Sequence, residues 1–459
     1  MVELAEPLTP SMREVSRTQQ PDGSYVVESE PADDDVQPDT VTVHGMLRDG
    51  PPRGVTLVDA FNVGRNEVWG GVVADPGMER LQASYALIGG RVGGRNVRFR
   101  STRLQLQHLD VWAQLPGVRT DVVPDGSRAV VTLERPDEDT TVLSNPAGRL
   151  VLGTVLTMAK PTVRGAGLTR TAELRWESSG DGLTVDELWA RLVDPLRVLV
   201  TLAVGADSPV VSLEVRGEDR WLQVVHPGLG VANAELLPAH EVLLSREHLN
   251  LDALGRWLSQ APSLSPIPRL VTGVAVSPSQ RTVENQLLEL AAAAEGLHRR
   301  LYPDQRTMTK DQARKTRRAA VAAVPEEVQP LIKEVLGHLG ETTYRERLRV
   351  LVDSGRGAAP GVIGDLTEWT DRIVSARNGF AHQLVDAKGA EAELEENLVL
   401  LGSLRWLLTS LMLLEAGTAP EALAARLVQH EPFLHFRRQA QRWLPAVYPE
   451  ATSSVSDHT

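Results

Sequence analysis

The sequence of 459 residues contains no cysteine. This absence excludes disulfide bonds, thiolate zinc sites and a cysteine nucleophile. Proteins of the reducing cytosol do without disulfides, so the composition is compatible with a cytoplasmic location.

Long apolar runs are also missing. No segment approaches the roughly 20 uninterrupted apolar residues of a membrane-spanning helix, and Arg197 and Arg405 break the longest candidates. Residues 1–6 lack a basic region followed by an apolar one, so no export signal is expected. We therefore predict a soluble, cytoplasmic protein with no membrane partner.

Positively charged residues are fewer than negatively charged ones: the sequence has 48 Lys and Arg residues and 60 Asp and Glu residues, which gives a formal net charge of -12. This balance argues against a protein that coats nucleic acid nonspecifically, although it permits a local basic cleft.

The length of the chain exceeds what one hydrophobic core supports, and the hydrophobic content of 42% is enough for two cores. Two domains are expected.

The first part of the chain is rich in β-forming residues. Residues 1–38 carry Pro, Ser and an acidic run and are expected to be irregular. In residues 39–262, short β-rich runs separated by Gly, Pro and Asp indicate an antiparallel sandwich or barrel. One helix interrupts them, opened by a capping box of Thr184 and Glu187 and running toward Leu202. The predicted strands are 41–44, 67–73, 97–100, 129–133, 172–176 and 209–215.

Helical periodicity takes over in the second part. Recurring prolines in 263–280 indicate a linker, and residues 281–448 show helix after helix with short joins, which is typical of a bundle. Residues 449–459 are polar and expected to be disordered. The fold class is therefore α+β, with a β-rich, sandwich- or barrel-like domain followed by an all-α domain. The predicted helices are 283–302, 309–324, 328–339, 344–352, 363–377, 394–414 and 420–429.

The most informative stretch is 377–382, Arg-Asn-Gly-Phe-Ala-His, at the end of a predicted helix. Arginine stays charged and holds a phosphate through its fork of donors, whereas histidine has a pKa near neutrality and carries protons both ways. Spacing alone carries little weight, because Arg103/His108 and Arg220/His226 have the same kind of spacing in predicted strands.

Helical geometry restricts how this pair works. On one uninterrupted helix Arg377 and His382 would point about 140° apart around the axis, whereas Asn378 and His382 share a face. Two copies of the helix packed about a twofold axis would complete one cleft from both chains. A homodimer or higher homo-oligomer is therefore expected.

The segment 373–382 resembles the R-N-x-x-x-H signature of HEPN domains, helical modules that commonly act as metal-independent ribonucleases in bacterial defence. The helix 284–301 resembles the first helix of the ApeA type of HEPN protein, and 194–203 after a β-rich half is similar to the ApeA N-terminal domain. The resemblance covers roughly residues 40 to 430 in the same two-domain order.

The resemblance implies roles for four residues. Arg377 would hold the scissile phosphate, His382 would act as general acid or base, Asn378 would orient the histidine or a phosphate oxygen, and Glu295 would face the cleft. The alternative for Glu295 is a solvated helix surface, on which it pairs with Arg299 four residues later. Attack by the 2′-hydroxyl of RNA needs no metal or other cofactor and leaves 2′,3′-cyclic phosphate ends. The implied substrate is unpaired RNA, such as a tRNA loop.

A basic helix face offers a second RNA contact. Four basic residues recur on one side of the helix 309–324, and a fifth lies beside them. This pattern is compatible with contacts to an RNA backbone and equally with a basic face that only contacts solvent. They are Lys310, Arg314, Arg317 and Arg318, with Lys315 next to them.

Weaker signals have simpler explanations. His240, Glu241 and His248 lack the spacing of a zinc-binding helix. The segment 89–94, Gly-Gly-Arg-Val-Gly-Gly, is not followed by the Lys-Ser/Thr of a phosphate loop, so turns between strands explain it better.

The leading hypothesis is an antiphage, abortive-infection-type ribonuclease, whose N-terminal domain regulates RNA cleavage after sensing a phage-derived trigger. One alternative is a noncatalytic dimerisation module that presents the β-rich domain as a ligand-binding or scaffold surface. Another is a carbohydrate-binding protein, which would expose tryptophans of the β-rich domain for sugar stacking. The relevant residues are Trp69, Trp112, Trp176 and Trp189.

Overall fold

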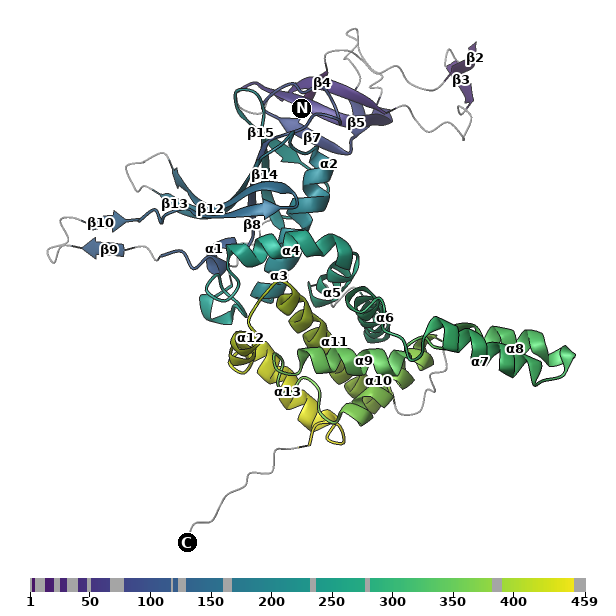
Figure 1. Ribbon diagram of the computed structural model, residues 1–459. Coiled ribbons are helices and arrows are strands. Elements are labelled where there is room, and N and C mark those ends of the chain that lie inside the picture. Colours follow the sequence, from purple (N-terminus) through teal and green to yellow (C-terminus); the bar gives the residue numbers. More distant parts are fainter. Residues whose placement is uncertain are drawn as a thin grey trace. The chain divides into compact units, whose positions relative to one another are not determined.

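The chain forms two compact units in a computed structural model (Figure 1). The first unit comprises residues 1–109, 116–194 and 209–234, and the second comprises 110–115, 195–208 and 235–459. The structure describes residues 2–4, 13–19, 25–30, 40–47, 51–66, 78–116, 119–122, 129–159, 167–231, 237–276, 281–381 and 390–449.

The first unit is built on an eleven-stranded antiparallel sheet with the order β1-β4-β5-β7-β15-β14-β8-β13-β12-β11, and β6 pairs with β5. Its strands are β1 (Val2–Leu4), β4 (Val41–Leu47), β5 (Arg53–Asn66), β6 (Met78–Gln82), β7 (Tyr85–Ile88), β8 (Ser101–Leu106), β11 (Asp139–Ser144), β12 (Ala147–Met158), β13 (Leu168–Ser178), β14 (Val210–Arg216) and β15 (Trp221–Val225). Two hairpins add β2 (Arg13–Gln19) with β3 (Tyr25–Glu30) and β9 (Arg119–Val122) with β10 (Ala129–Thr132).

The expected β-rich domain is confirmed, but the sheet is open rather than a sandwich or barrel. Among the described strands, the order begins at β1 and ends at β11, and these two strands do not pair with each other. Alternation along β8 buries Thr102, Leu104 and Leu106 on one face. Such alternation shows which face of a strand is buried, yet it is the same in a sandwich, a barrel and an open sheet.

The predicted helix is present as three consecutive segments, α2 (Val185–Leu188), the π-helical turn η1 (Trp189–Val193) and α3 (Asp194–Val204). The capping box of Thr184 and Glu187 forms, with backbone-to-side-chain bonds of 2.9 and 3.2 Å. Leu188 and Leu192 are fully buried. Local capping chemistry therefore places this helix start correctly.

Several predicted segments differ in the structure. The expected irregular segment 1–38 contains β1, β2 and β3. Strand β1 pairs with β4, whereas β2 and β3 pair with each other as a hairpin, and the composition of the segment indicated neither pairing. The expected strand 97–100 is not regular: Phe99 forms only an isolated bridge to Leu183, and β8 begins at Ser101. The expected strand 67–73 lies outside the described residues, as do residues 450–459 of the predicted tail.

The second unit is helical, as expected. Its complete helices are α4 (Leu251–Leu264), α5 (Ile267–Val276), α6 (Val283–Leu301), α7 (Lys310–Ala322), α8 (Gln329–Val335), α9 (Tyr344–Gly355), α10 (Leu366–Ala381), α11 (Ala390–Glu415), α12 (Pro420–Leu427) and α13 (Glu431–Trp443). It also includes α1 (Leu109–Trp112) except its first residue, and α3 except its first residue, Asp194. Short 3-10 turns are η2 (Ala239–Glu241), η4 (Glu326–Val328) and η5 (Leu336–His338).

The expected linker 263–280 is largely helical instead. It holds the end of α4 and all of α5, and both helices belong to the second unit. Pro268 occupies the first turn of α5, where the missing N–H costs nothing because that position has no intrahelical partner. The prolines near residue 267 therefore mark the start of α5 rather than a flexible linker.

Helices α6 and α11 form the centre of the second unit. Helix α6 packs against α5, α9, α10 and α11, and α11 also packs against α13. The predicted apolar stripe of α6 is buried, including Leu287, Leu290 and Leu297. Residues 393–415 of α11 are long and apolar enough for a membrane span, with mean hydropathy 1.6, but 72% of the apolar window is buried in this core.

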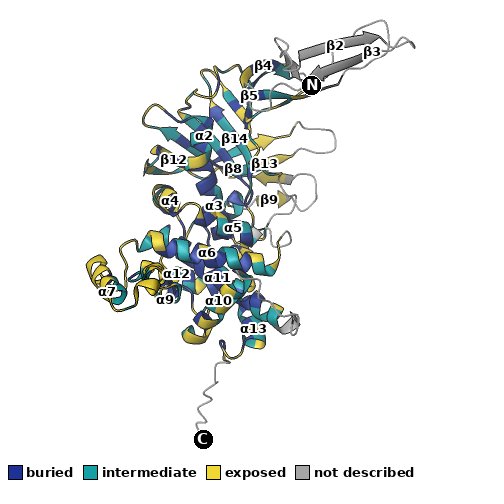
Figure 2. Ribbon diagram, turned by 90° about the vertical axis from the view of Figure 1, so that its right-hand side faces the viewer, coloured by how far each residue is buried: buried dark blue, intermediate teal, exposed yellow. Residues whose placement is uncertain are grey.

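Helices α7 and α8 form a two-helix arm that projects from the rest of the second unit (Figure 1). Most of α7 is exposed in Figure 2, and Ala313 is its one buried residue. Backbone bonds close the base of the arm: Thr307 N donates to Gly340 O at 3.1 Å, and Arg306 forms a bridge with Glu341.

A buried histidine makes the stability of this unit pH-dependent. His430 is 4% exposed and lies edge-on to Trp406 at 5.7 Å between ring centroids. Burial, and then the charges of Arg426 and Arg405, lower the pKa of His430 to about 4. The unfolded chain binds the proton more tightly, so this stability is present above the ordinary pKa and lost as pH falls toward 4.

We expect the wild-type protein to lose about 2 kcal/mol of unfolding free energy through His430 between pH 7 and pH 4.5. Urea denaturation of His430→Gln at both pH values should show a correspondingly smaller loss. His435→Gln is the control, because that histidine is exposed on α13. Equal losses in wild type and His430→Gln would contradict the prediction.

Candidate functional site

Arg377 lies near the end of α10 and contacts two other helices. Its Nη2 donates to Glu295 Oε2 on α6 at 3.0 Å. Its guanidinium carbon lies 4.5 Å from the ring centroid of Tyr344, the first residue of α9. An ion pair on one side and a cation–π contact on the other fix the orientation of the guanidinium.

The start and middle of α10 are firmly placed. Asp365 Oδ1 accepts bonds from the backbone N–H groups of Thr367 and Glu368 at 3.0 and 2.9 Å, which caps the helix. Trp369 is fully buried, and its Nε1 donates to Ser403 on α11 at 2.8 Å. Arg377 is thus carried by an anchored helix.

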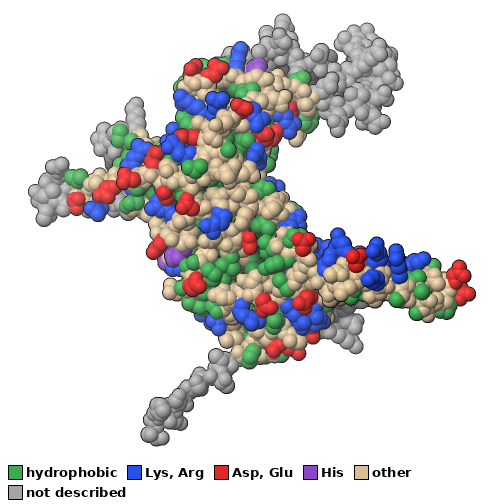
Figure 3. All heavy atoms as spheres, in the orientation of Figure 1, with side chains coloured by type: hydrophobic (Ala, Val, Ile, Leu, Met, Phe, Trp, Pro, Cys, Tyr) green, Lys and Arg blue, Asp and Glu red, His purple; other side chains and the backbone are tan. Residues whose placement is uncertain are grey.

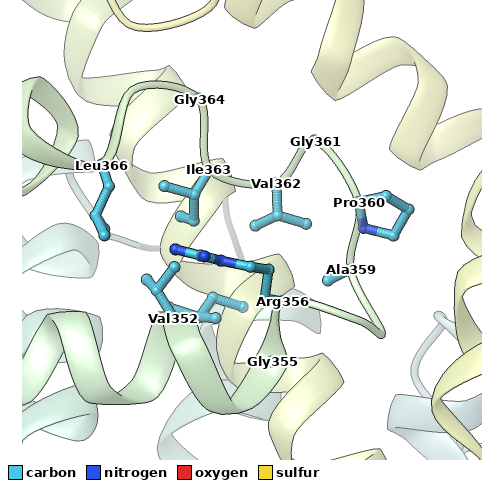
Figure 4. Close-up of a pocket in the computed structure, with 11 residues that line it drawn as sticks. Val352, Gly355, Arg356, Ala359, Pro360, Gly361, Val362, Ile363, Gly364 and Leu366 are labelled. Carbon is cyan, nitrogen blue, oxygen red and sulfur yellow. The ribbon is translucent and has the colours of Figure 1, made fainter.

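The loop between α9 and α10 encloses a small hollow of about 210 Å³ (Figure 4). Arg356 extends across it between Val352 and Ile363, and Arg356 also pairs with Asp353 at 3.0 Å. Tyr448 donates to Val362 O at 2.9 Å and holds the loop. Aliphatic side chains and backbone line most of this space, so we assign it to packing.

Glu295 joins Arg377 to a second arginine. Its Oε1 accepts from Arg299 on the same helix at 3.0 Å, while its Oε2 accepts from Arg377. The sequence left open whether Glu295 faces the cleft or merely pairs with Arg299 on a solvated helix surface. Both contacts are present, because the carboxylate has two oxygens and lies between the two helices.

A polar cluster continues from Glu295 to the base of the arm. Arg299 lies 4.0 Å from Glu341, and Arg347 is buried with its Nε donating to Thr342 O at 3.0 Å. Burial, and then the charge of Arg299, lower the pKa of Arg347. A hydrogen bond from His338 lowers the pKa of Glu341.

Tyr344 supplies a neutral surface beneath Arg377. Burial raises the pKa of the phenol, Arg377 lowers it and Glu295 raises it, so the group stays protonated at neutral pH. Its hydroxyl donates to Ala291 O on α6 at 3.2 Å. The ring is therefore held by α6 while it supports a cation from α10.

The structure does not bring all predicted site residues together. Asn378 is exposed and its side chain has no hydrogen-bond partner among the described residues, and His382 lies outside them. The five basic residues of α7 lie on the arm, where Figure 3 shows a band of Lys and Arg side chains. Four are exposed and Arg317 is half-buried; the exposed ones are Lys310, Arg314, Lys315 and Arg318.

A second hollow of about 640 Å³ lies between α10 and α11, beside Gly379 and Phe380. Its charged lining is mostly acidic, and its one arginine, Arg372, pairs with Glu396 at 2.8 Å and with Glu368 at 3.8 Å. Carboxylates repel a phosphate backbone. The acidic lining therefore disfavours a polyanionic ligand in this hollow.

Comparison with known families agrees with the two-unit architecture. The family model for ApeA N-terminal domain 1 matches residues 20–257, which is more than half of the chain. The chain belongs to the ApeA family. The model for Apea-like HEPN matches residues 288–422 of this ApeA protein, a range that includes Glu295, Arg377 and His382. No curated protein and no solved structure matches the chain.

The resemblance seen in the sequence is thereby confirmed, and the two domains support an antiphage, HEPN-containing protein. Sequence reasoning missed Tyr344 and considered Arg299 only as a surface partner. Thr343 and Glu346 predict the start of α9, since Thr343 caps that helix. Nothing in the sequence, however, tells which tyrosine meets Arg377.

The carbohydrate-binding alternative loses support. Trp112 and Trp176 are at most 1% exposed, and Trp189 is half-buried and stacked on His226 with 3.9 Å between ring centroids. Trp69 lies outside the described residues. The three of these four tryptophans that the structure describes therefore offer no open stacking platform.

Proposed function

We propose that this ApeA protein is a metal-independent endoribonuclease of antiphage defence that cleaves unpaired RNA, such as a tRNA loop. The observation that carries the proposal is the guanidinium of Arg377, oriented by Glu295 and Tyr344 five residues before His382. Arg377 remains 34% exposed, so its remaining N–H groups are open to a phosphate.

The proposed reaction is an internal transesterification. The 2′-oxygen forms a bond to the neighbouring phosphorus as His382 accepts the 2′-hydroxyl proton, and the bond from phosphorus to the 5′-oxygen breaks. The leaving oxygen receives a proton from a second acid. Arg377 stabilises the charge on the phosphorane oxygens. The products are a 2′,3′-cyclic phosphate and a 5′-hydroxyl.

A second copy of the chain completes the proposed cleft. On a continuous helix Arg377 and a residue five positions on would point apart, so the second proton carrier is assigned to the R-N-x-x-x-H segment of a second copy of the chain. Nη2 of Arg377 already donates to Glu295, so an RNA phosphate would bind the other N–H groups of the same guanidinium.

We assign the trigger-dependent control of RNA cleavage to the β-rich unit. Growth arrest then follows because cleaved RNA no longer supports translation.

Incubation of the purified protein with total RNA in EDTA tests the chemistry directly. Cleavage with cyclic phosphate ends is expected, detected as fragments that resist ligation until the phosphate is removed. Ends with 3′-hydroxyl groups would contradict the proposed transesterification. No cleavage by protein activated in phage-infected cells would favour the noncatalytic dimerisation module instead.

The basic face of α7 is proposed to bind the RNA backbone. We expect Arg314→Ala with Arg318→Ala to weaken binding of single-stranded RNA about tenfold at low salt and to reduce the slope of log K against log salt by about 0.7 per lost phosphate contact. Fluorescence anisotropy across a salt series measures both quantities.

The matched control is Arg438→Ala with Arg442→Ala on α13. These two arginines are also exposed and four residues apart on a helix, and Arg438 pairs with Glu431 much as Arg314 pairs with Asp311. Both double variants remove two charges. An equal effect of both would show that only net charge matters and would remove the assignment to α7.

A further inference from the structure

The β-rich unit contains a cleft of about 940 Å³ that none of the roles above uses. Its walls come from the start of β5 with Gly54, the glycine-rich segment 89–93, residues 97–101 and the hairpin of β14 and β15 at residues 216–222. This volume is within the usual range for small-molecule sites. We name it the arginine cleft, after its five lining arginines, Arg91, Arg98, Arg100, Arg216 and Arg220.

The glycine-rich segment is held in place from beneath. Thr56 is fully buried; it donates to Gly90 O at 3.3 Å and accepts from Val92 N at 3.1 Å. Gly89 N donates to Gly54 O at 2.8 Å, and a Cβ on Gly54 would lie only 3.2 Å from the carbonyl carbon of Gly90. The turn predicted for these glycines is therefore a preorganised wall rather than a loose connection.

Three of the arginines lack an acidic partner. Arg98 is engaged by Glu187 at 2.8 Å, and Arg100 lies 4.0 Å from Asp181. Within the described residues, by contrast, no carboxylate lies within ion-pair distance of the other three, which are Arg91, Arg216 and Arg220. In a chain with a net charge of -12, three arginines along one cleft without acidic partners favour an anionic ligand there.

We propose that the arginine cleft binds a small molecule with two or more phosphate groups, such as a nucleoside diphosphate or triphosphate. Guanidinium groups hold phosphate oxygens in bidentate pairs. Glu218 and Asp219 lie on the same wall; they accept hydrogen bonds from ribose hydroxyls and repel a continuous RNA backbone. The size of the cleft and these carboxylates favour a nucleotide over RNA.

Isothermal titration calorimetry of the full chain without divalent cations tests the proposal, using ADP, ATP, inorganic tripolyphosphate, adenosine and a 12-nucleotide RNA. We expect saturable binding of one phosphate-bearing compound per chain and at least tenfold weaker binding of adenosine. Tighter binding of ATP than of tripolyphosphate identifies a nucleotide, whereas equal binding identifies the phosphate chain alone as the recognised group.

Arg91→Ala with Arg220→Ala should weaken this binding at least tenfold without lowering the melting temperature. Arg119→Ala with Arg135→Ala is the control, because it removes the same charge from the same unit outside the cleft. The proposal is overturned if no phosphate compound binds, if the two double variants bind equally, or if only RNA responds to Arg91 and Arg220. Binding is read without cleavage, so the result is independent of the proposed nuclease function.

Discussion

Arg377→Ala should lower RNA cleavage by about 10³-fold while the protein keeps its fold. The guanidinium is proposed to stabilise charge that develops on the phosphorane, and alanine leaves that charge without its fixed partner. Single-turnover cleavage of a labelled RNA measures the effect. Stability should change little, because the ion pair with Glu295 is partly exposed and such pairs contribute at most about 1 kcal/mol.

Arg377→Lys separates charge from shape. Lysine keeps the positive charge but lacks the planar fork, so we expect an activity between those of the parent and the alanine variant. Arg345→Ala is the matched control, because Arg345 on α9 pairs with Asp371 on α10 at comparable exposure but does not touch Glu295. RNA cleavage by the Arg377→Ala variant at the parental rate would contradict the proposed nuclease mechanism.

Glu295→Ala should have the second-largest effect, a fall in kcat of about 10- to 100-fold with little change in KM. The carboxylate does not touch the proposed substrate; it positions Arg377 and neutralises part of the charge shared with Arg299. Loss of the carboxylate frees the guanidinium to adopt unproductive orientations. Single-turnover and steady-state kinetics separate this effect from weaker RNA binding.

Two comparisons identify a positioning role for Glu295. Glu295→Gln keeps one hydrogen-bond acceptor and should recover part of the lost rate. In the Arg377→Ala background, Glu295→Ala should cost little more, because the group that it positions is already absent. Glu289→Ala breaks an α6 ion pair with Arg281 and is the control. Full additivity of the Glu295 and Arg377 effects would contradict the coupling.

These experiments also separate the catalytic proposal from its main rival. A noncatalytic dimerisation module would tolerate Arg377→Ala and Glu295→Ala in both RNA cleavage and phage protection. Loss of protection with the dimer intact, measured by multi-angle light scattering, would instead support the ribonuclease.

Local chemistry made part of the fold predictable from the sequence. The capping box at Thr184, the apolar stripe of α6 and the β-rich run 172–176, which lies within β13, all depend on neighbours a few residues away. The same holds for the R-N-x-x-x-H segment, whose residue types indicated phosphate and proton chemistry. The structure confirms the capping box, the apolar stripe and the strand because helix and strand periodicity is a property of the local chain. The roles of the R-N-x-x-x-H residues stay a prediction.

Only the tertiary structure decided the rest. The open sheet places β15 and β14 between β7 and β8, and such long-range pairing is not encoded in any one strand. The contact of Arg377 with Glu295 and Tyr344 joins three helices, and the arginine cleft joins four segments of one sheet. The sequence determined the chemical character of these side chains, whereas packing determined which of them meet, because contacts between distant segments depend on the whole core.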